Sequence, residues 1–387
     1  MPDGRDPLTV RVLTSLSQVP QADWDACAGP ENPFVSHAFL SALEDSGSAT
    51  AETGWLAQHL AIADHDGRLA GVAPLYLKNH SYGEYVFDWG WAEAYERAGR
   101  RYYPKLQCAV PFTPVTGPRL LLRPDSDQAL YGTALVAAMG ELAKQGNTSS
   151  LHITFCTADE AKLFRDHGFL TRSGLQYHWH NPGYRDFEDF LAQLVSRKRK
   201  AIRRERRQVR DSGVRIKMLT GDDIKPAHWE AFYGFYLATV DKRWAHAYLT
   251  REFFLMLGET LGEQVALVVA EEDGEIIAGA LNLIGGDTLY GRNWGAARHM
   301  PFLHFEACYY QAIDFAIEHG LKRVEAGAQG EHKIQRGYLP SKTHSAHRIA
   351  DAGFQDAVSD FLERERRGMA LQKAALDQES PFRKEEP

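Results

Sequence analysis

The polar side chains that could do chemistry gather in one stretch, residues 289–340, where they follow two apolar segments. After the first segment come Arg292, Asn293, Trp294, Gly295 and His304. After the second come Gln329, Gly330, Glu331, His332, Lys333, Arg336 and Tyr338. Acyl transfer to an amine needs a base for the ammonium proton and donors for the oxyanion. Both kinds of side chain are present, so we predict the active site here.

Residues 327–333 give the sharper of the two signals. Polar and charged residues are packed there between glycines, directly after a predicted strand. Glu331 or His332 could act as the base, while Lys333 and Arg336 could hold a phosphate or the carboxylate of an acceptor. The structural alternative is a short helix with Glu331 in its first turn, where the helix dipole favours a carboxylate.

His304 and Tyr338 are further candidates for proton transfer. A histidine titrates near neutral pH and therefore suits a general base. Tyr338 could protonate a leaving group. Each residue also has a structural alternative, because a lone histidine or a core tyrosine can simply complete the packing.

The elements that must position these residues follow one another without a break. The sequence predicts a strand, a glycine-rich turn, an amphipathic helix over 302–319, a second strand and a polar loop. This order places both polar groups at the ends of neighbouring strands, where open α/β sheets bind their ligands.

A strongly basic helix is predicted at 196–210, which holds nine Lys or Arg residues and one Glu. Such a helix attracts polyanions through phosphate contacts. The candidate contacts are Arg199, Lys200, Arg203, Arg204 and Arg207. The alternative is a solvated helix held to acidic neighbours such as Glu188 and Asp189. No aromatic residues are interleaved, so stacking on a single strand is not expected, and DNA is not a predicted partner.

The first half of the chain carries an aromatic, proline-rich region that includes Phe87–Trp91 and Pro111–Pro114. Asp88, Trp89 and Trp91 could bind an acceptor, with Asp88 gripping its amine. The alternative is an ordinary aromatic core.

Composition indicates a globular protein of two or three domains, with 387 residues, 44% apolar and 25% charged. Four widely spaced cysteines suggest free thiols in a reducing compartment. The sequence shows no secretory signal and no long apolar run, so we expect a cytoplasmic protein without a membrane span. The histidines around Glu331 match no compact zinc pattern, and no metal is expected.

The two halves of the chain repeat the same order of elements. Hairpins at Asp66-Gly67 and Asp273-Gly274 each lead into a Trp-Gly segment, then a helix, a strand, a short helix and another strand. This repetition predicts a duplicated α/β unit. We expect the units at 8–180 and 181–376, with a polar tail at 377–387.

Several blocks of the sequence resemble a bacterial family of FemAB-like predicted N-acyltransferases, which are related to the Fem-type aminoacyltransferases of peptidoglycan synthesis. The blocks are NPFVSHAFLSALEDSG, SRKRKAIRRERR, RNWGA, PFLHFEACYYQAIDFAIEHG and GAQGEHKIQRGYLP. The resemblance implies an α/β (α+β) fold of two tandem GNAT-like units, each a mixed, mostly antiparallel sheet flanked by helices.

The resemblance also implies transfer of an acyl or aminoacyl group to the amine of a small molecule or peptide. The co-substrate would be acyl-CoA or aminoacyl-tRNA, with no tightly bound cofactor. Residues 292–297 match the family's phosphate-binding pattern, so Arg292, Asn293, Trp294 and Gly295 are expected to bind the donor, together with Gln329, Gly330, Lys333 and Arg336. The alternative function is a non-catalytic protein that recognises a cell-wall precursor or another anionic ligand.

Overall fold

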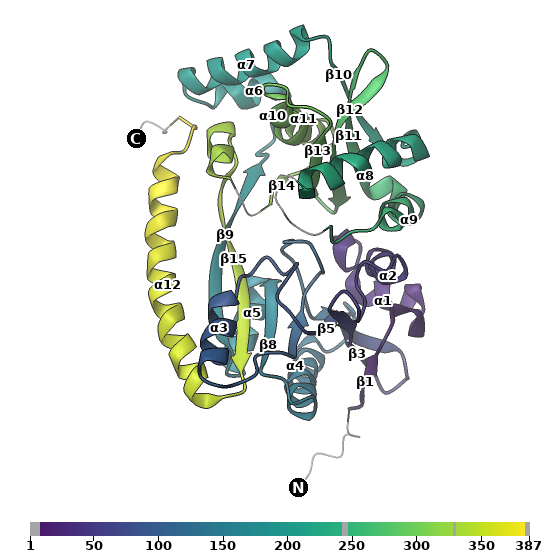
Figure 1. Ribbon diagram of the computed structural model, residues 1–387, viewed down its shortest axis with the longest axis vertical. Coiled ribbons are helices and arrows are strands. Elements are labelled where there is room, and N and C mark those ends of the chain that lie inside the picture. The colour runs from purple at the N-terminus through teal and green to yellow at the C-terminus, as the bar shows by residue number, and fades with distance from the viewer. Residues whose placement is uncertain (1–7, 242–246, 328–329, 384–387) are drawn as a thin grey trace. The chain divides into compact units, whose positions relative to one another are not determined.

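A computed structural model describes residues 8–241, 247–327 and 330–383, and its chain divides into two compact units. Unit 1 comprises residues 1–174 and 343–368, and unit 2 comprises 175–342 and 369–387. Each unit is a mixed sheet flanked by helices, as the sequence predicts (Figure 1). Among the described helices, none is both long enough and apolar enough to span a membrane.

The predicted unit boundary at residue 181 is wrong in one respect, because the chain exchanges segments between the units. Residues 175–180 belong to unit 2, where His178–His180 pair with β14 (Arg323–Glu325). Residues 343–368 return to unit 1, where His344–Ile349 pair with β8 (Ser150–Cys156). Each segment belongs to the unit with which its strand pairs. The turn at Asn181-Pro182-Gly183, which suggests a boundary in the sequence, therefore does not separate the units.

Unit 1 holds two groups of paired strands, ordered β1-β3-β4-β7 and β15-β8-β6-β5-β2. Its strands are β1 (Val10–Leu13), β2 (Trp55–Ala57), β3 (His59–Ala63), β4 (Leu69–Ala73), β5 (Leu75–Lys78), β6 (Lys105–Cys108), β7 (Leu121–Leu122), β8 and the end of β15 (Leu339–Ile349). Its helices are α1 (Gln21–Ala28), α2 (His37–Asp45), α3 (Trp89–Arg97), α4 (Gln128–Gln145), α5 (Ala158–Asp166) and most of α12 (Ala352–Gln378).

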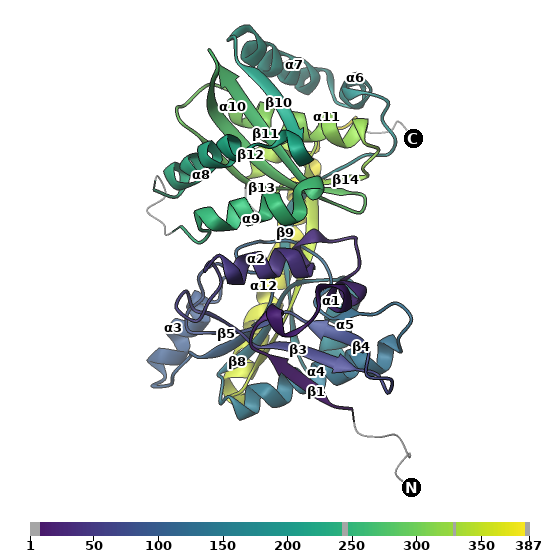
Figure 2. The ribbon, with the colours of Figure 1, turned by 90° about the vertical axis from the view of Figure 1, so that its right-hand side faces the viewer.

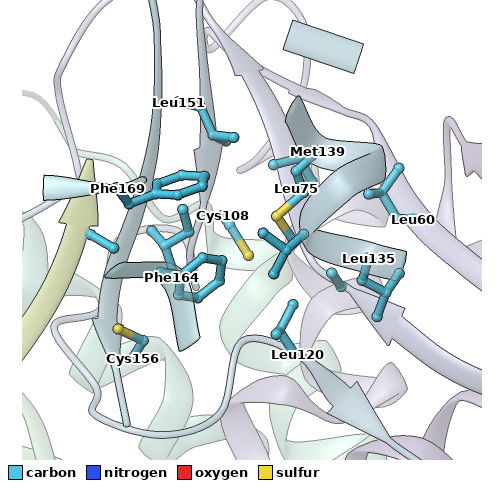
Figure 3. Packing of buried hydrophobic residues seen from close by; sticks show 14 of the residues in the cluster. Leu60, Leu75, Cys108, Leu120, Leu135, Met139, Leu151, Cys156, Phe164 and Phe169 are labelled. Carbon is cyan, nitrogen blue, oxygen red and sulfur yellow. The ribbon is translucent and has the colours of Figure 1, made fainter. Parts of the chain in front are cut away.

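The core of unit 1 lies between this sheet and helices α4 and α5. Leu135 and Met139 of α4 and Phe164 of α5 pack against Leu151 of β8 and Cys108 of β6, and all five are buried (Figure 3). All four cysteines are free thiols, as the sequence predicts, and three of them are buried.

Unit 2 is built on the strand order β10-β11-β12-β13-β14-β9. Its strands are β10 (Arg215–Thr220), β11 (Val265–Glu272), β12 (Glu275–Gly285), β13 (Thr288–Ala296), β14 and the end of β9 (Leu170–His180). Its helices are α6 (Phe187–Ala192), α7 (Ser196–Asp211), α8 (Pro226–Asp241), α9 (Arg251–Leu261), α10 (Leu303–Phe305), a π-helical turn η5 (Glu306–Tyr310), α11 (Gln311–Glu318) and the 3-10 turn η6 (Glu331–Arg336).

Helices cover both faces of the unit 2 sheet (Figure 2). On one face, Gly279 and Gly295 are register partners, and both lie against α8. On the other face, Ala280 packs with Ala307 of the π-helical turn. The described part of the polar tail is held to unit 2, because the backbone amide of Arg383 donates to the carbonyl of Gln193.

The second face of the unit 1 sheet is polar, although it too is buried. His152 of β8 and His347 of β15 are register partners, with 2.7 Å between their Nδ1 atoms. Burial lowers the pKa of His152 to about 3 and holds the pKa of His347 well below its usual value. Both rings are therefore neutral in the folded protein at physiological pH.

We expect the free energy of unfolding to decrease as the pH falls below 6.5, the ordinary pKa of histidine. Below that pH the unfolded chain binds a proton at each of these two histidines and the folded chain does not, so acid favours unfolding. Glu84 acts in the opposite direction between pH 4.5 and about 7, because burial raises its pKa to about 7. Two protons outweigh one, and the buried His178, whose pKa is lowered to about 3, acts in the same direction as His152 and His347.

Urea unfolding at pH 5 and pH 7 measures this dependence. The variant His347→Gln should show a flatter dependence, whereas His65→Gln, which changes an exposed ring, should match the wild type. Equal stability of the wild type at the two pH values would contradict the prediction.

Candidate active site at the ends of β13 and β14

The candidate site is organised by a pair of parallel strands in unit 2. β13 and β14 pair from Thr288–Arg323 to Tyr290–Glu325, so their carboxyl ends lie at the same edge of the sheet. The first group of polar residues lies at the end of β13 and in the connection after it, and the second lies in the segment after β14. The predicted juxtaposition of the two groups at the ends of neighbouring strands is therefore confirmed.

Arg292 and Asn293 lie within β13, in a β-bulge. Gly291 pairs with Asn282 and Trp294 pairs with Ala280, so Arg292 and Asn293 together stand opposite one residue of β12. The predicted glycine-rich turn at this point is wrong, because the strand continues to Ala296, while donor binding by residues 292–295 stays a prediction. The Arg292 guanidinium donates to the Gly291 carbonyl at 2.8 Å and lies 4.0 Å from the Glu325 carboxylate.

Gly295, a predicted donor-binding residue, has a packing role. A Cβ atom at this position would lie 2.3 Å from the carbonyl oxygen of Phe235 in α8, so only glycine allows the close approach of helix and strand. Trp294 contributes instead to the opposite face, where its ring lies 5.4 Å from the ring of His304.

The connection after β13 contains two irregular features before α11 begins. Phe302 adopts a left-handed conformation, with φ of 65°, at the start of α10. The next five residues form a π-helical turn, a feature that often occurs at functional sites. This turn carries Tyr309, which sequence reasoning missed because its spacing reads as part of an ordinary helix.

The structure brings together candidate residues from the two loops. The Tyr309 hydroxyl lies 3.0 Å from Nε2 of His332. The His304 ring lies 5.3 Å from the Tyr309 ring and 6.1 Å from the His332 ring. His304 and His332, predicted separately, thus belong to one cluster.

His332 combines an exposed position with a lowered pKa. Partial desolvation lowers the pKa of its imidazole, and the positive charges of Arg336 and Lys333 lower it further. The ring lies over Gly330, where a Cβ atom would come within 2.5 Å of it. Gly330, which has a φ of 102°, therefore makes room for His332. Gln329 lies outside the described residues.

Lys333 is buried beside this cluster. Its ammonium donates to the carbonyl oxygens of Ala326 and Gly327, the two residues that follow β14. Burial lowers its pKa to about 8, and the neighbouring Arg292 contributes in the same direction. Glu331, the alternative base, is exposed at the start of η6.

Arg336 and Tyr338 lie on the buried side of the cluster. The Arg336 guanidinium donates to both carboxylate oxygens of Glu205 in α7 at 3.0 Å and to the His332 carbonyl at 2.9 Å, and both Arg336 and Glu205 are buried. Tyr338 is fully buried, and its hydroxyl donates to the Tyr309 carbonyl at 3.1 Å. These contacts favour the structural alternative for Tyr338 and pair Arg336 with a carboxylate of the chain itself.

The basic helix α7 has one buried face and one exposed face that carries most of its cations. Its buried residues are Ile202, Glu205 and Val209. Its exposed cations are Arg197, Lys200, Arg203, Arg204, Arg207 and Arg210. Arg199 is half-buried, and Arg203 forms an exposed ion pair with Glu188. A groove of about 390 Å³ runs between α7, α6 and α11, lined partly by Arg203, Arg207 and Arg210.

Unit 1 has an equivalent parallel pair, β6 and β8, but its chain occupies the corresponding end. The fully buried Arg119 donates to the carbonyl of Thr154 at 2.9 Å, and the amide of Gly117 donates to that of Phe155 at 3.0 Å. Glu160 accepts from the backbone amides of Arg119 and Leu120. These contacts hold residues 115–120 against the end of β8, so the position equivalent to the unit 2 site is filled.

Of the three predicted acceptor-binding residues, only Trp89 is exposed. Asp88 is buried and accepts from Lys105 at 2.5 Å and from Tyr102 at 2.7 Å. Trp91 is buried and lies against the His347 ring. The Asp88 carboxylate therefore pairs with a cation of the chain itself. Among the described residues, no group of three or more His, Cys, Asp or Glu side chains could hold a metal ion.

Comparison with known proteins identifies a matching family and several structures of similar fold. A FemAB-like family model, described as peptidoglycan biosynthesis/recognition, matches residues 15–384. The crystal structure of FemX aligns with 88% of this chain and 98% of its own, at 13% identity and a TM-score of 0.55. The C-terminal domain of a putative lysylphosphatidylglycerol synthetase from Agrobacterium fabrum aligns with 90% and 97%, at 8% identity and a TM-score of 0.56.

A tandem GNAT protein from the clavulanic acid biosynthesis pathway aligns with 89% of this chain and 99% of its own, at 14% identity and a TM-score of 0.47. No curated protein matches the sequence. The predicted α/β fold of two units, each a mixed sheet flanked by helices, is confirmed.

We expect Arg336→Met to lower the free energy of unfolding by about 3–5 kcal/mol, because it leaves the buried Glu205 carboxylate without its cation. Adding Glu205→Leu should recover part of that loss, and urea unfolding measures both effects. The matched control is Arg203→Met, which breaks an exposed ion pair on α7, the helix that carries Glu205, and should change stability little. Equal effects of the two arginine substitutions would contradict the structural role of Arg336.

Proposed function

The chain belongs to the FemAB-like family and is an acyl or aminoacyl transferase, and we propose that transfer takes place at the ends of β13 and β14 with His332 as the base. The observation that carries this assignment is the contact between His332 Nε2 and the Tyr309 hydroxyl, at 3.0 Å. Of the two alternative bases, Glu331 and His332, only the latter is held by such a contact among the described residues.

His332 suits the role because its lowered pKa keeps the imidazole neutral at physiological pH. A neutral imidazole carries one hydrogen, and in the active tautomer Nε2–H donates to the Tyr309 oxygen, which leaves a lone pair on Nδ1. Tyr309 then acts as a positioning residue that fixes the ring and stabilises the imidazolium. His304 forms the neighbouring wall of the site.

The transfer step requires one proton to move from the acceptor to the leaving group. The acceptor amine attacks the activated carbonyl, and Nδ1 of His332 takes the proton that the amine loses as the new N–C bond forms. Lys333, with a pKa of about 8, remains charged at pH 7 and supplies positive potential near the oxyanion. The imidazolium returns the proton to the leaving oxygen or sulfur as its bond to the carbonyl carbon breaks.

We assign aminoacyl-tRNA as the donor, with acyl-CoA as the alternative that the test must separate. The exposed cations of α7 from Arg197 to Arg210 extend over about 20 Å at 1.5 Å per residue. A row of this length suits a nucleic-acid backbone better than the few phosphates of coenzyme A. Arg199, Lys200, Arg203, Arg204 and Arg207 remain the assigned contacts. Aminoacyl-tRNA is made in the cytoplasm, which we propose as the location of the protein.

The acceptor is a primary amine of a peptide or small molecule, and the family description suggests a component of peptidoglycan synthesis. In unit 1, the exposed indole of Trp89 is the candidate contact. Asp88 and Trp91 would support Trp89 from beneath, because both are buried.

Replacing His332 by Gln should lower kcat/KM about 10²–10⁴-fold, the usual contribution of a general base. In the wild type, kcat/KM should fall on the acid side with a midpoint below pH 6.5, because protonation removes the lone pair of His332. Tyr309→Phe should move this limb to lower pH, since the imidazolium loses a hydrogen-bond acceptor. Aminoacyl transfer measured from pH 5 to 8 provides the test, with Glu331→Gln as the neighbouring comparison. A larger loss in Glu331→Gln than in His332→Gln would reverse the assignment.

Reversing Arg204 and Arg207 to Glu should weaken tRNA binding and reduce the slope of log K against log salt by about one unit for each lost contact. Filter binding across a salt series measures the slope. The double substitution of Arg364 and Arg367 by Glu makes the same charge change on α12 and should leave the slope unaltered. If the α7 variant binds tRNA normally but loses acetyl-CoA binding, coenzyme A is the donor.

A further inference from the structure

Unit 1 contains a long insertion that the core of the fold does not require. Residues 79–104 connect β5 to β6, whereas two residues, Gly286 and Asp287, connect the corresponding hairpin β12–β13 in unit 2. The insertion presents four aromatic side chains to solvent within eight residues. Their exposed fractions are 49% for Tyr82, 37% for Tyr85, 58% for Phe87 and 40% for Trp89. We call residues 82–89 the aromatic turn.

Hydrogen bonds from three residues outside the aromatic turn fix its backbone. The Lys78 ammonium donates to the Tyr82 carbonyl at 3.2 Å, and the amide of Phe112 donates to the Gly83 carbonyl at 3.1 Å. The Arg172 guanidinium donates to the Phe87 carbonyl at 2.7 Å. The turn is thus held at three points along its length.

Buried ion pairs hold the same turn from its inner side. Lys105, which is fully buried, donates to Glu84 at 2.7 Å and to Asp88 at 2.5 Å. These two carboxylates alternate in sequence with the exposed aromatic residues. Tyr85, between them, adopts a left-handed backbone with φ of 59°, which is unfavourable for a bulky residue.

The arrangement costs free energy that a simple connection would not require. Desolvating several charges is expensive even when they are paired, and the aromatic rings that they hold in place remain in water. A rigid backbone with outward aromatic side chains is suited to recognition, because little conformational entropy is lost on binding. The aromatic turn therefore has the properties of a binding surface.

The charge and ring geometry of the turn select one class of ligand. Residues 82–89 contain no Lys or Arg, and the three arginines of the insertion, Arg97, Arg100 and Arg101, lie at the end of α3 and after it. The turn itself therefore lacks the row of cations that an anionic membrane or a nucleic acid would require. The rings of Tyr82 and Trp89 meet edge to face with 4.8 Å between their centroids, and both side chains are exposed to solvent. The C–H face of a pyranose stacks on such rings, while its hydroxyls bond to nearby polar groups.

We infer that the aromatic turn binds a neutral glycan of N-acetylated amino sugars, the sugar component of peptidoglycan. The choice of this sugar rests on the proposed function, whereas the surface itself rests on the exposed, fixed aromatic residues. Tyr82 and Trp89 form the stacking pair, and Phe87 extends the apolar surface beside them. The buried ions keep the rings turned outward.

Isothermal titration with an oligomer of four N-acetylglucosamine units tests this site without any donor or acceptor amine. The wild type should bind the oligomer, and Trp89→Ala and Tyr82→Ala should each bind about tenfold more weakly or worse. Trp89→Phe should keep most of the affinity because it keeps a ring. Leu371→Ala, which removes an exposed apolar side chain on α12, should bind as the wild type does.

Three results would overturn the inference: no binding by the wild type, equal binding by the alanine variants, or aromatic-dependent binding to phosphatidylglycerol vesicles in place of the sugar. The thermal unfolding midpoint of each variant shows whether it is folded. The two proposals remain separable. Sugar binding by a protein that transfers no acyl group would remove the proposed reaction alone, whereas transfer to a peptide amine without sugar binding would remove this inference alone.

Discussion

Parallel pairing of two strands within an otherwise mostly antiparallel sheet is the constraint from which the site follows. Parallel neighbours cannot be joined by a tight turn and need a crossover connection of a dozen or more residues. In unit 2 that connection is the segment from Ala297 to Lys322, which contains the π-helical turn and α11. It returns the chain to β14 so that both strands end at one edge. Tyr309 on the crossover and His332 beyond β14 meet there as a consequence.

The same constraint has a different outcome in unit 1, which explains why a duplicated fold holds one such cluster among the described residues. The crossover after β6 begins with residues 109–120, and these bind back onto the end of β8 through Arg119. The Arg119 guanidinium donates to the carbonyl oxygens of Thr154, Gly117, Pro118 and Val115, all of which belong to the chain itself. A buried arginine used in this way is structural. Unit 1 has instead developed the insertion between β5 and β6, at the opposite end of these strands.

Sequence reasoning could predict the order of elements, the duplication and the adjacency of the two loops, because these follow from periodicity and chain order. It placed Arg292–Gly295 in a loop because a β-bulge beside a packed glycine has the composition of a turn. It missed Tyr309 because a π-helical turn changes the direction in which the side chains point. A helical period of 3.6 residues does not predict that change. The sequence also does not predict the exchange of strands between the units, because strand pairing is decided by contacts between residues that are remote in sequence.

The roles of the charged residues cannot be predicted from their neighbours in the sequence. Arg336 is five residues beyond Glu331, and its neighbours suggest a ligand contact. Its partner, Glu205, lies 131 residues away on α7. The next residue of that helix, Arg206, binds Glu306 and Asp314 on the crossover. Helix α7 is thereby tied to both segments that carry the cluster of Tyr309 and His332. A helix fixed in this way can display its remaining cations in a constant position relative to His332, which is what a donor bound through its phosphates would require.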